Sequence, residues 1–355
     1  MMLRREFVLL GAAAAAGACS DPSPAGRSGS RASGVAADAP DGPATGRPNP
    51  SALYNHTNAH VPASPRIGWA VKSLRHGGTA GQNPTRSYLQ QSVFKLWVAA
   101  CLLDKVDRRE MSLDDPITVT KADLGFPHQP IAEKVGPDGY RTTLLDLIRY
   151  IVIQSDNPAA DILLQRAGGP AAVTAWLTSK GVEGIRIDRN ERALHRAADE
   201  IDAVTGARQD ALIDSFVGGT LDGSTLDGAT PGGTVDALAM LHRGELLSPA
   251  GTRLLLSIMG ETETGQNRIK AALEPGWRWG HKTGTGGRAR GRTRTLGVND
   301  IGLLTAPDGE VFAVAVFVAG ASEPIAEQEG WIADVGRGVI AQWKQGRADS
   351  AASTD

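Results

Sequence analysis

The chain has 355 residues, with 37 lysines and arginines against 39 aspartates and glutamates, and a formal net charge of −2. This length suffices for one large domain or two smaller ones with a sizeable core. The near-balance of charge excludes the global positive field that attracts nucleic acid, so we expect no nucleic-acid partner. After the first twenty positions, no apolar run approaches the ~18 residues that a membrane-spanning helix needs.

Residues 1–19 predict an export signal. Arg4 and Arg5 precede an apolar stretch from Phe7 to Ala16, and small residues follow, in the pattern of a twin-arginine signal. Cys19 comes directly after these small residues, which is compatible with lipidation as well as with simple cleavage. We therefore expect an exported, periplasmic protein, with a membrane tether through Cys19 as one of two outcomes.

A disordered linker is predicted at 20–50, because that segment is rich in Pro, Gly, Ser and Ala and poor in large apolar residues. The folded part is expected to begin near Tyr54. Apolar periodicity predicts strands at Arg66–Leu74, Trp277–Thr283, Asp300–Leu304 and Val311–Val318. It predicts helices at Ser92–Val106, Thr142–Gln154, Asn157–Ala167, Pro170–Lys180, Val235–Arg243, Ala250–Met259 and Ile332–Trp343.

This order of elements favours an α+β fold with a helical domain inserted between two halves of an α/β domain. The α/β domain is expected at 51–90 and 232–345, the helical domain at 91–231, and a disordered tail at 346–355. The body contains only Cys101, so no internal disulfide is expected, and V-A-A-C-L-L predicts a small buried side chain. The histidines show no ligand spacing, and we expect neither a metal nor a cofactor.

Ser92-Val93-Phe94-Lys95 places a hydroxyl and an amine three residues apart. If Ser92 opens a helix, Lys95 lies one turn further on the same face, where its amine can take the serine proton. Taken alone, a capping serine and a surface lysine explain the motif equally well.

Ser155-Asp156-Asn157 lies between two predicted helices. Ser155 there can relay a proton to a leaving nitrogen, and the amide of Asn157 can hold a substrate carbonyl. A helix cap explains the same residues.

Lys282-Thr283-Gly284 follows a predicted strand. Thr283 can bind a carboxylate, and Gly284 leaves room for a ligand along the strand edge. The backbone N–H of Thr285 can pair with that of Ser92 to form an oxyanion hole.

These three motifs, in this order, resemble those of the class A serine β-lactamases. The resemblance runs from about Tyr54 to Trp343. Four phrases are similar to the PER-type extended-spectrum branch: I-Q-S-D-N-P-A-A-D-I-L-L, T-G-Q-N-R-I-K, H-K-T-G-T and N-D-I-G. The resemblance implies an antiparallel sheet with flanking helices, an all-helical domain, and an active site between them. It also implies acylation of Ser92 by penicillins and cephalosporins, followed by hydrolysis. We expect a monomer.

The resemblance places a water-activating glutamate of the Ω-loop at Glu191. A general base contributes roughly 10²–10⁴-fold in rate, and a penicillin-binding protein without it stays acylated. A solvated surface glutamate is the alternative. The proton acceptor during acylation remains open between Lys95 and Glu191 acting through a water.

The Ω-loop region departs from the family pattern. His195 stands where an asparagine usually helps to hold the water, and it either takes that task or packs the loop. An insertion lies between Ala197 and Gly228, with a helix-like piece at Gln209–Phe216; it either shapes the mouth of the site or is a neutral surface feature. Arg189 fits one half of the ion pair across the neck of the loop, but the sequence does not identify its aspartate.

A substrate carboxylate needs a cation beside Lys282. Val298 stands where many relatives carry an arginine, and Arg268 is the alternative that the PER-type branch uses. Arg288, Arg290, Arg292 and Arg294 follow the Lys-Thr-Gly motif; a solvated basic hairpin is favoured over a device that steers anions. His128 is expected to line the mouth opposite Lys282.

Two other functions fit the fold. One is a D-Ala-D-Ala carboxypeptidase, transpeptidase or esterase, against which Glu191 argues. The other is a non-catalytic module that binds a cell-wall ligand. The complete set of Ser92, Lys95, Ser155 and Glu191 argues against the second, because a binding module needs no water-activating base.

Overall fold

A five-stranded antiparallel sheet runs through the centre of the fold, in the order β2-β1-β10-β9-β8. The computed structural model describes residues 53, 55, 57, 59–219, 226–287 and 291–352. All of these belong to one compact unit, Ala44–Asp355. The strands of this sheet are β1 (Ile67–Ser73), β2 (Gly77–Gln82), β8 (Arg278–Gly286), β9 (Gly297–Thr305) and β10 (Val311–Val318). The predicted export signal and linker lie outside the described residues.

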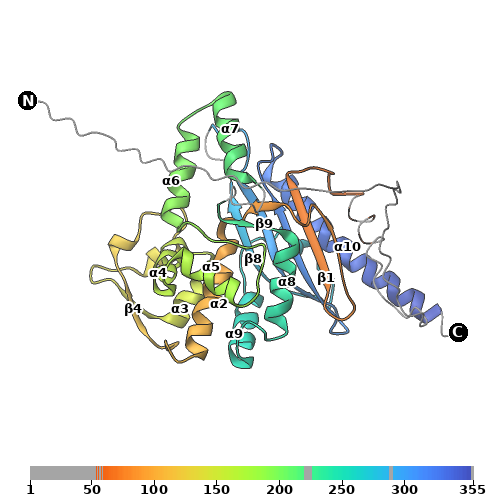
Figure 1. Cartoon of the computed structure of the whole chain (residues 1–355), viewed down its shortest axis with the longest axis horizontal. Coiled ribbons are helices and arrows are strands. Elements are labelled where there is room, and N and C mark those ends of the chain that lie inside the picture. The colour runs from red at the N-terminus through yellow and green to blue at the C-terminus, as the bar shows by residue number, and fades with distance from the viewer. Residues whose placement is uncertain are drawn as a thin grey trace, which may run out of the picture. The chain divides into compact units, whose positions relative to one another are not determined.

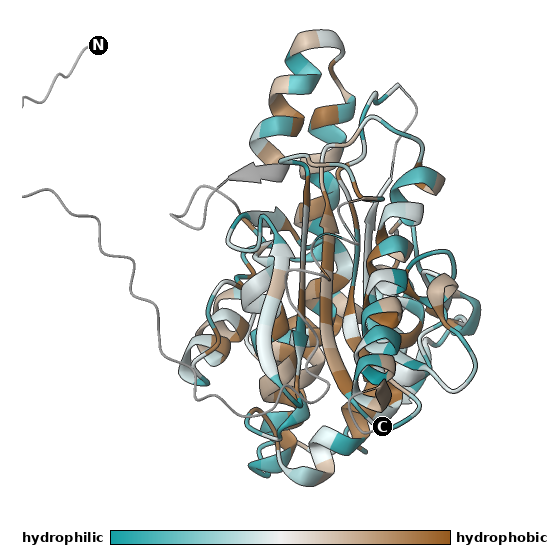
Figure 2. Cartoon of the chain, turned by 90° about the vertical axis from the view of Figure 1, so that its right-hand side faces the viewer, coloured by the Kyte–Doolittle hydropathy of each residue, from teal (hydrophilic) through white to brown (hydrophobic). Residues whose placement is uncertain are grey.

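Both faces of the sheet are buried, and the strand period of two divides the side chains between two cores. On β10, Ala313, Ala315 and Phe317 face the core that contains α2 (Phe94–Asp107). The alternate positions, such as Val314 and Val316, face α10 (Ile325–Ala352). Figure 2 shows the apolar strands enclosed between the helices. The fold is therefore α+β, as the sequence predicts.

The remaining elements cover the sheet and extend it. The other helices are α3 (Leu144–Arg149), α4 (Asn157–Ala167), α5 (Pro170–Ser179), α6 (Glu191–Asp202), α7 (Gly206–Val217), α8 (Pro231–His242) and α9 (Pro249–Gly260). The short strands are β3 (Ser87–Leu89), β4 (Pro116–Val119), β5 (Tyr140–Thr143), β6 (Gly218–Gly219) and β7 (Gly228–Ala229). Figure 1 shows α2, α3, α4 and α5 gathered on one side of the sheet. No helix in the described ranges has the length and apolarity needed to cross a bilayer.

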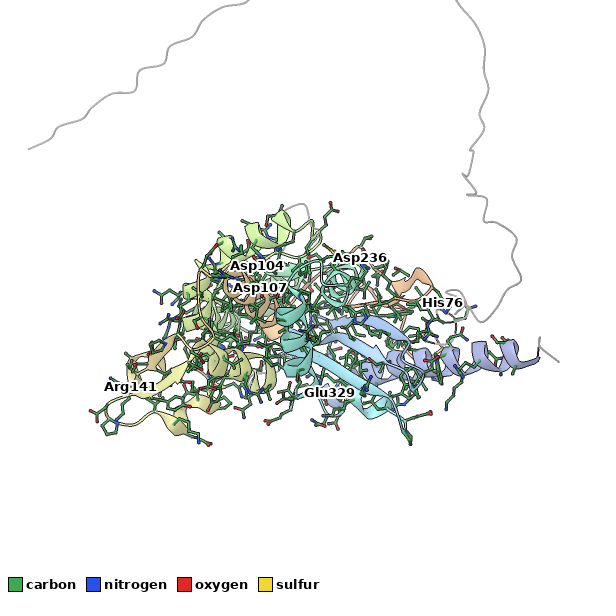
Figure 3. The ribbon with its side chains drawn as sticks, turned by 90° about the horizontal axis from the view of Figure 1, so that it is seen from below. His76, Asp104, Asp107, Arg141, Asp236 and Glu329 are labelled. Carbon is green, nitrogen blue, oxygen red and sulfur yellow. The ribbon has the colours of Figure 1, made fainter. Side chains whose placement is uncertain are left out.

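Two aspartates at the C-terminal end of α2 tie the helices together (Figure 3). Asp107 accepts from the hydroxyl of Ser248, which caps α9, at 2.6 Å. Asp104 accepts from Trp176 Nε1 at 3.0 Å and from Lys180 Nζ at 2.8 Å, on or next to α5. Helix α2 also carries Lys95 in its first turn, so these ties hold the helix that positions the site.

Two segments differ from their predicted structure. The sequence predicts one helix at Thr142–Gln154. The stretch contains instead the last two residues of β5, helix α3, and a π-helical turn at Tyr150–Gln154. The helix starts after Thr143 because its hydroxyl accepts from Asp146 N. The predicted disordered tail is wrong as far as Ala352, because α10 continues to that residue. Arg347 accounts for this continuation: it lies over the Trp343 ring at 5.0 Å and pairs with Asp308 at 2.9 Å.

Candidate active site

Ser92 lies in a short 3-10 turn (Gln91–Val93) that leads directly into α2. Two contacts hold this turn against β8 and β9. The amide of Asn299 donates to the carbonyls of Leu89 and Gln90 at 2.9 and 3.0 Å. A Cβ at Gly284 would lie 2.4 Å from the Gln90 carbonyl oxygen. The glycine therefore admits the turn that carries Ser92, whereas we expected it to make room for a ligand.

Lys95 is fully buried and has an acceptor for each of its three N–H groups. Its Nζ donates to the Ser155 carbonyl at 2.7 Å and to Asn157 Oδ1 at 2.5 Å. It also lies 2.8 Å from Glu191 Oε1. The Ser92 hydroxyl donates to the same Glu191 oxygen at 3.4 Å. The serine hydroxyl, the amine and the carboxylate thus meet at one oxygen atom.

Ser155 ends the π-helical turn with φ of 62°, in the left-handed region. A non-glycine residue held there costs of order 1–3 kcal/mol and needs support from its surroundings. Asp156 gives that support, because its carboxylate caps α4 through Ala159 N at 2.8 Å and accepts from Ile131 N at 2.7 Å. The strained turn directs the Ser155 hydroxyl toward Lys282 Nζ, which donates to it at 2.9 Å.

Lys282 is fully buried on β8. Its Nζ also donates to the Thr283 carbonyl at 2.8 Å. Burial, together with the charge of Lys95, holds the pKa of Lys282 well below its usual range. The Thr283 hydroxyl lies 2.6 Å from that of Thr264. An amine with a lowered pKa next to a serine hydroxyl is suited to passing a proton along the chain of polar groups.

Glu191 is the first residue of α6 and is buried. Asn190 caps this helix by accepting from Ala193 N at 2.9 Å. The carboxylate of Asp161, on α4, accepts from the backbone N–H groups of Glu191 and Arg192 at 2.7 and 3.3 Å. Burial raises the pKa of Asp161. We did not predict a role for Asp161, although it follows Asn157 by one helical turn on α4 and so shares its face.

His195 lies one turn after Glu191 on α6 and faces the site. Its Nε2 is 3.0 Å from Asn157 Nδ2 and 3.6 Å from Glu191 Oε2. Because Asn157 Oδ1 accepts from Lys95, the amide nitrogen of Asn157 is the group that faces Nε2 as a donor. The ring also meets Phe126 edge-on at 6.1 Å. His128 lines the same cleft, and its Nε2 lies 2.7 Å from the Gln154 carbonyl.

Arg268 is buried behind β8 and is not among the residues that line the cleft. Its guanidinium donates to Thr285 Oγ1 at 2.7 Å and to the Asn299 carbonyl at 2.7 Å. It also pairs with Glu329 on α10 at 3.1 Å (labelled in Figure 3). The structure therefore places Arg268 behind Thr285, which does line the cleft, and separates it from the residues around Ser92.

The cleft has a volume of about 530 Å³. Its walls come from the Ser92 turn, the Ser155 turn, β8, α6, α7 and the β8–β9 connection. The predicted site residues that line it are Ser92, His128, Ser155, Asn157, Glu191, His195, Thr283 and Thr285. No group of three or more metal-ligating side chains occurs in the described part of the chain.

Asp227 is the partner of Arg189 that the sequence left unassigned. Arg189 Nε lies 2.5 Å from Asp227 Oδ2. Asp227 is buried, and its other oxygen accepts from the backbone N–H groups of Asp188 and Arg189 at 2.8 and 2.9 Å. This pair closes the segment that contains α6 and α7 at its neck.

Two arginines of the β8–β9 connection are buried and ion-paired. Arg292 pairs with Asp202 at the end of α6, and Arg294 pairs with Asp214 on α7. The expectation of a solvated basic hairpin is therefore wrong for these two, because aspartates of the insertion neutralise them. Arg288 and Arg290 lie outside the described residues.

Comparisons with known proteins identify the family of the chain. The profile of the Beta-lactamase enzyme family matches residues 53–343. The chain is 31% identical over 254 residues to extended-spectrum β-lactamase PER-1 of Pseudomonas aeruginosa, covering 71% of this chain and 74% of that one. It is 30% identical over 277 residues to β-lactamase VEB-1 of the same organism, covering 77% and 83%.

Solved structures give the same result for the fold. A β-lactamase from Chitinophaga pinensis superposes with a TM-score of 0.69 at 31% identity, covering 83% of this chain and 98% of that one. The TLA-3 extended-spectrum β-lactamase superposes with a TM-score of 0.70 at 28% identity, covering 84% and 99%. With its Ser92, Lys95 and Glu191 in contact at the cleft, the chain belongs to the class A β-lactamase family of serine hydrolases.

Proposed function

We propose that this chain hydrolyses the amide bond of penicillins and cephalosporins through an ester on Ser92, and that Glu191 activates the water that breaks this ester. One observation carries the proposal: Glu191 Oε1 lies within hydrogen-bond reach of both Lys95 Nζ, at 2.8 Å, and Ser92 Oγ, at 3.4 Å. A buried carboxylate in this place can accept a proton from the serine and later from a water.

In the acylation step, Ser92 Oγ attacks the β-lactam carbonyl carbon and the ring C–N bond breaks. The serine proton passes to Glu191, the acceptor of its hydroxyl, with Lys95 holding that carboxylate in place. The leaving nitrogen takes a proton from the Ser155 hydroxyl, which Lys282 Nζ replenishes across 2.9 Å. The lowered pKa of Lys282 favours this donation.

Between the two steps, Glu191 releases the serine proton to solvent and Lys282 regains one, so the carboxylate is again free to accept a proton. In the deacylation step, a water attacks the ester carbonyl and gives its proton to Glu191, which passes it to the departing Ser92 oxygen and restores the hydroxyl. His195 supports this step through Asn157, because its Nε2 accepts from the amide that also contacts Lys95. The substrate carboxylate is bound by Thr283 and Thr285, with Arg268 behind Thr285 and Lys282 next to Thr283. The backbone N–H groups of Ser92 and Thr285 form the oxyanion hole.

Turnover of the chromogenic cephalosporin nitrocefin tests this function. Many cycles per enzyme are expected. One equivalent of acylation without turnover would favour a carboxypeptidase or transpeptidase, and no acylation would favour the binding module. A panel of a penicillin, an early cephalosporin, an oxyimino cephalosporin and a carbapenem then defines the spectrum. The extended-spectrum relative PER-1 supports inclusion of oxyimino cephalosporins in that spectrum.

Export through the twin-arginine route, to the periplasm, is part of the proposal and rests on Arg4, Arg5 and Cys19. Replacing both arginines by lysine is expected to keep the activity inside the cell. The mass of the mature N-terminus then distinguishes a lipidated Cys19 from simple cleavage.

A further inference from the structure

One wall of the cleft is built from two segments far apart in sequence. Ala198, Asp199 and Asp202 come from α6, and Phe216 comes from α7. Gly287 and Arg292 come from the connection between β8 and β9. Figure 1 shows α6 and α7, in green, extending past the ends of β8 and β9. What holds these segments together therefore decides how wide the cleft is on this side.

Arg292 makes the central contact of this wall. Its side chain is 4% exposed, and it meets Asp202 in a two-pronged pair, Nε to Oδ1 and Nη2 to Oδ2, each at 2.7 Å. Its Nη1 donates to the Gly287 carbonyl at 2.7 Å. Two parallel charge-assisted hydrogen bonds fix direction as well as distance. A guanidinium this buried is costly without its partner.

A second contact lies further along the same connection. Arg294 pairs with Asp214 on α7, and its Nε donates to the Gly320 carbonyl at 2.8 Å. Hydrogen bonding from Arg294 lowers the pKa of Asp214. Arg66 reaches the same carboxylate at 3.3 Å. We call the two pairs, Arg292–Asp202 and Arg294–Asp214, the arginine clasp.

We propose that the arginine clasp fixes α6 and α7 against the β8–β9 connection, and so sets the size of the ring substituent that the cleft admits. The geometry of α6 favours this role. Asp161 and Asn190 hold its first turn, where Glu191 lies, and the clasp holds its last residue, Asp202. At 1.5 Å per residue, the two anchors are separated by roughly 16 Å. Releasing the clasp therefore widens the mouth and leaves Glu191 in place.

The substrate-size part of this inference rests on the proposed β-lactamase activity. A competing role for Arg292 is direct contact with an anionic substituent of the substrate. The two roles predict opposite effects for the aspartate partner. If the clasp acts by holding the wall, losing Asp202 has the same effect as losing Arg292. If Arg292 binds the substrate, losing Asp202 frees the guanidinium and strengthens that binding.

The test uses three variants: Arg292→Gln, Asp202→Asn, and a double variant that combines Asp202→Arg and Arg292→Asp, which swaps the two charges. For each, kcat/KM is measured with a small penicillin and a bulky oxyimino cephalosporin. The ratio of kcat/KM for the bulky cephalosporin to kcat/KM for the small penicillin is expected to rise about tenfold in both single variants. In the double variant this ratio should return toward the wild-type value. Arg337→Gln, which removes an exposed pair with Asp334 on α10, is the control and should leave the ratio unchanged.

Hydrogen exchange on the full chain supplies a readout that needs no substrate. Amides of α6 and α7 should exchange faster in Arg292→Gln and Asp202→Asn, while those of α8 stay as in wild type. Unchanged exchange, an unchanged ratio, or opposite shifts in the two single variants would overturn the clasp. If wild type turns over no β-lactam but exchange responds as expected, the proposed activity and the size selection fall, and the holding role of the clasp stands.

Discussion

The carboxylate of Asp161 accepts the backbone N–H of Glu191 at 2.7 Å, so one acid holds another in place from a neighbouring helix. The contact attaches the first turn of α6 to α4, the helix that also begins with Asn157. Asp161→Ala is expected to lower kcat by roughly 10²-fold, because a misplaced base costs about that much. The loss should fall on deacylation, visible as a burst followed by a slow steady state.

The conservative variant Asp161→Asn separates positioning from folding. Its amide oxygen still accepts one N–H, so it should recover much of the activity that Asp161→Ala loses. If both variants lose stability and activity in the same proportion, Asp161 has only a structural role.

Glu191→Gln should still acylate, with Lys95 taking the serine proton in place of the missing carboxylate. It should then stall, because an amide cannot accept the proton of the water. The rate of deacylation is expected to fall by about 10²–10⁴-fold. Mass spectrometry of the intact protein after mixing with a β-lactam should show the covalent adduct on Ser92. Hydrolysis at a rate close to wild type would remove Glu191 from the role of deacylation base.

Lys282 lowers stability at neutral pH, since burial and the charge of Lys95 lower its pKa in the folded state only. The unfolded chain therefore binds the proton more tightly, and this cost shrinks as pH rises toward 10.5, the ordinary value. Lys282→Met should raise the melting temperature at pH 7, and the gain should become smaller in alkaline buffer. Melting temperatures of wild type and variant, measured from pH 7 to alkaline buffer, check the direction of this change. The variant should be inactive at every pH.

Asp227 closes the neck of the segment that carries α6 and α7, and it is 1% exposed. Asp227→Ala leaves the Arg189 charge without its partner, and about 3–5 kcal/mol of stability is expected to be lost. Denaturant unfolding measures the change. Asp334→Ala, which breaks the exposed pair with Arg337, is the matched control and should cost below about 1 kcal/mol. Equal losses in the two variants would contradict a structural role for the neck.

The central residues of the site could be predicted because each lies in a short local motif. Ser92 and Lys95 are one helical turn apart, and Lys282 to Thr285 share one strand. Their surroundings could not be predicted in the same way. Helix α6 went unpredicted although Leu194, Ala198 and Ile201 recur at helical spacing, because few of its side chains are large and apolar and the resemblance assigns the segment to a loop.

Long-range polar pairs left still less local signal. Asp202 and Asp214, the partners of Arg292 and Arg294, lie in the insertion that precedes α8, about 80 to 90 residues before the arginines in the sequence. Arg268 was expected at the substrate, but β9 and α10 occupy its guanidinium. A charged residue in a sequence shows which partners it needs, and only the fold decides whether a ligand or another part of the chain supplies them.

Gly284 has a consequence for how the site can change. The turn before Ser92 approaches it so closely that any side chain would displace the Gln90 carbonyl. The turn that carries Ser92 and strand β8 therefore behave as one rigid piece, because backbone atoms in direct contact set the spacing between them. Under the proposed function, variation in substrate range comes from the wall that the arginine clasp holds, where side-chain pairs fix the distance.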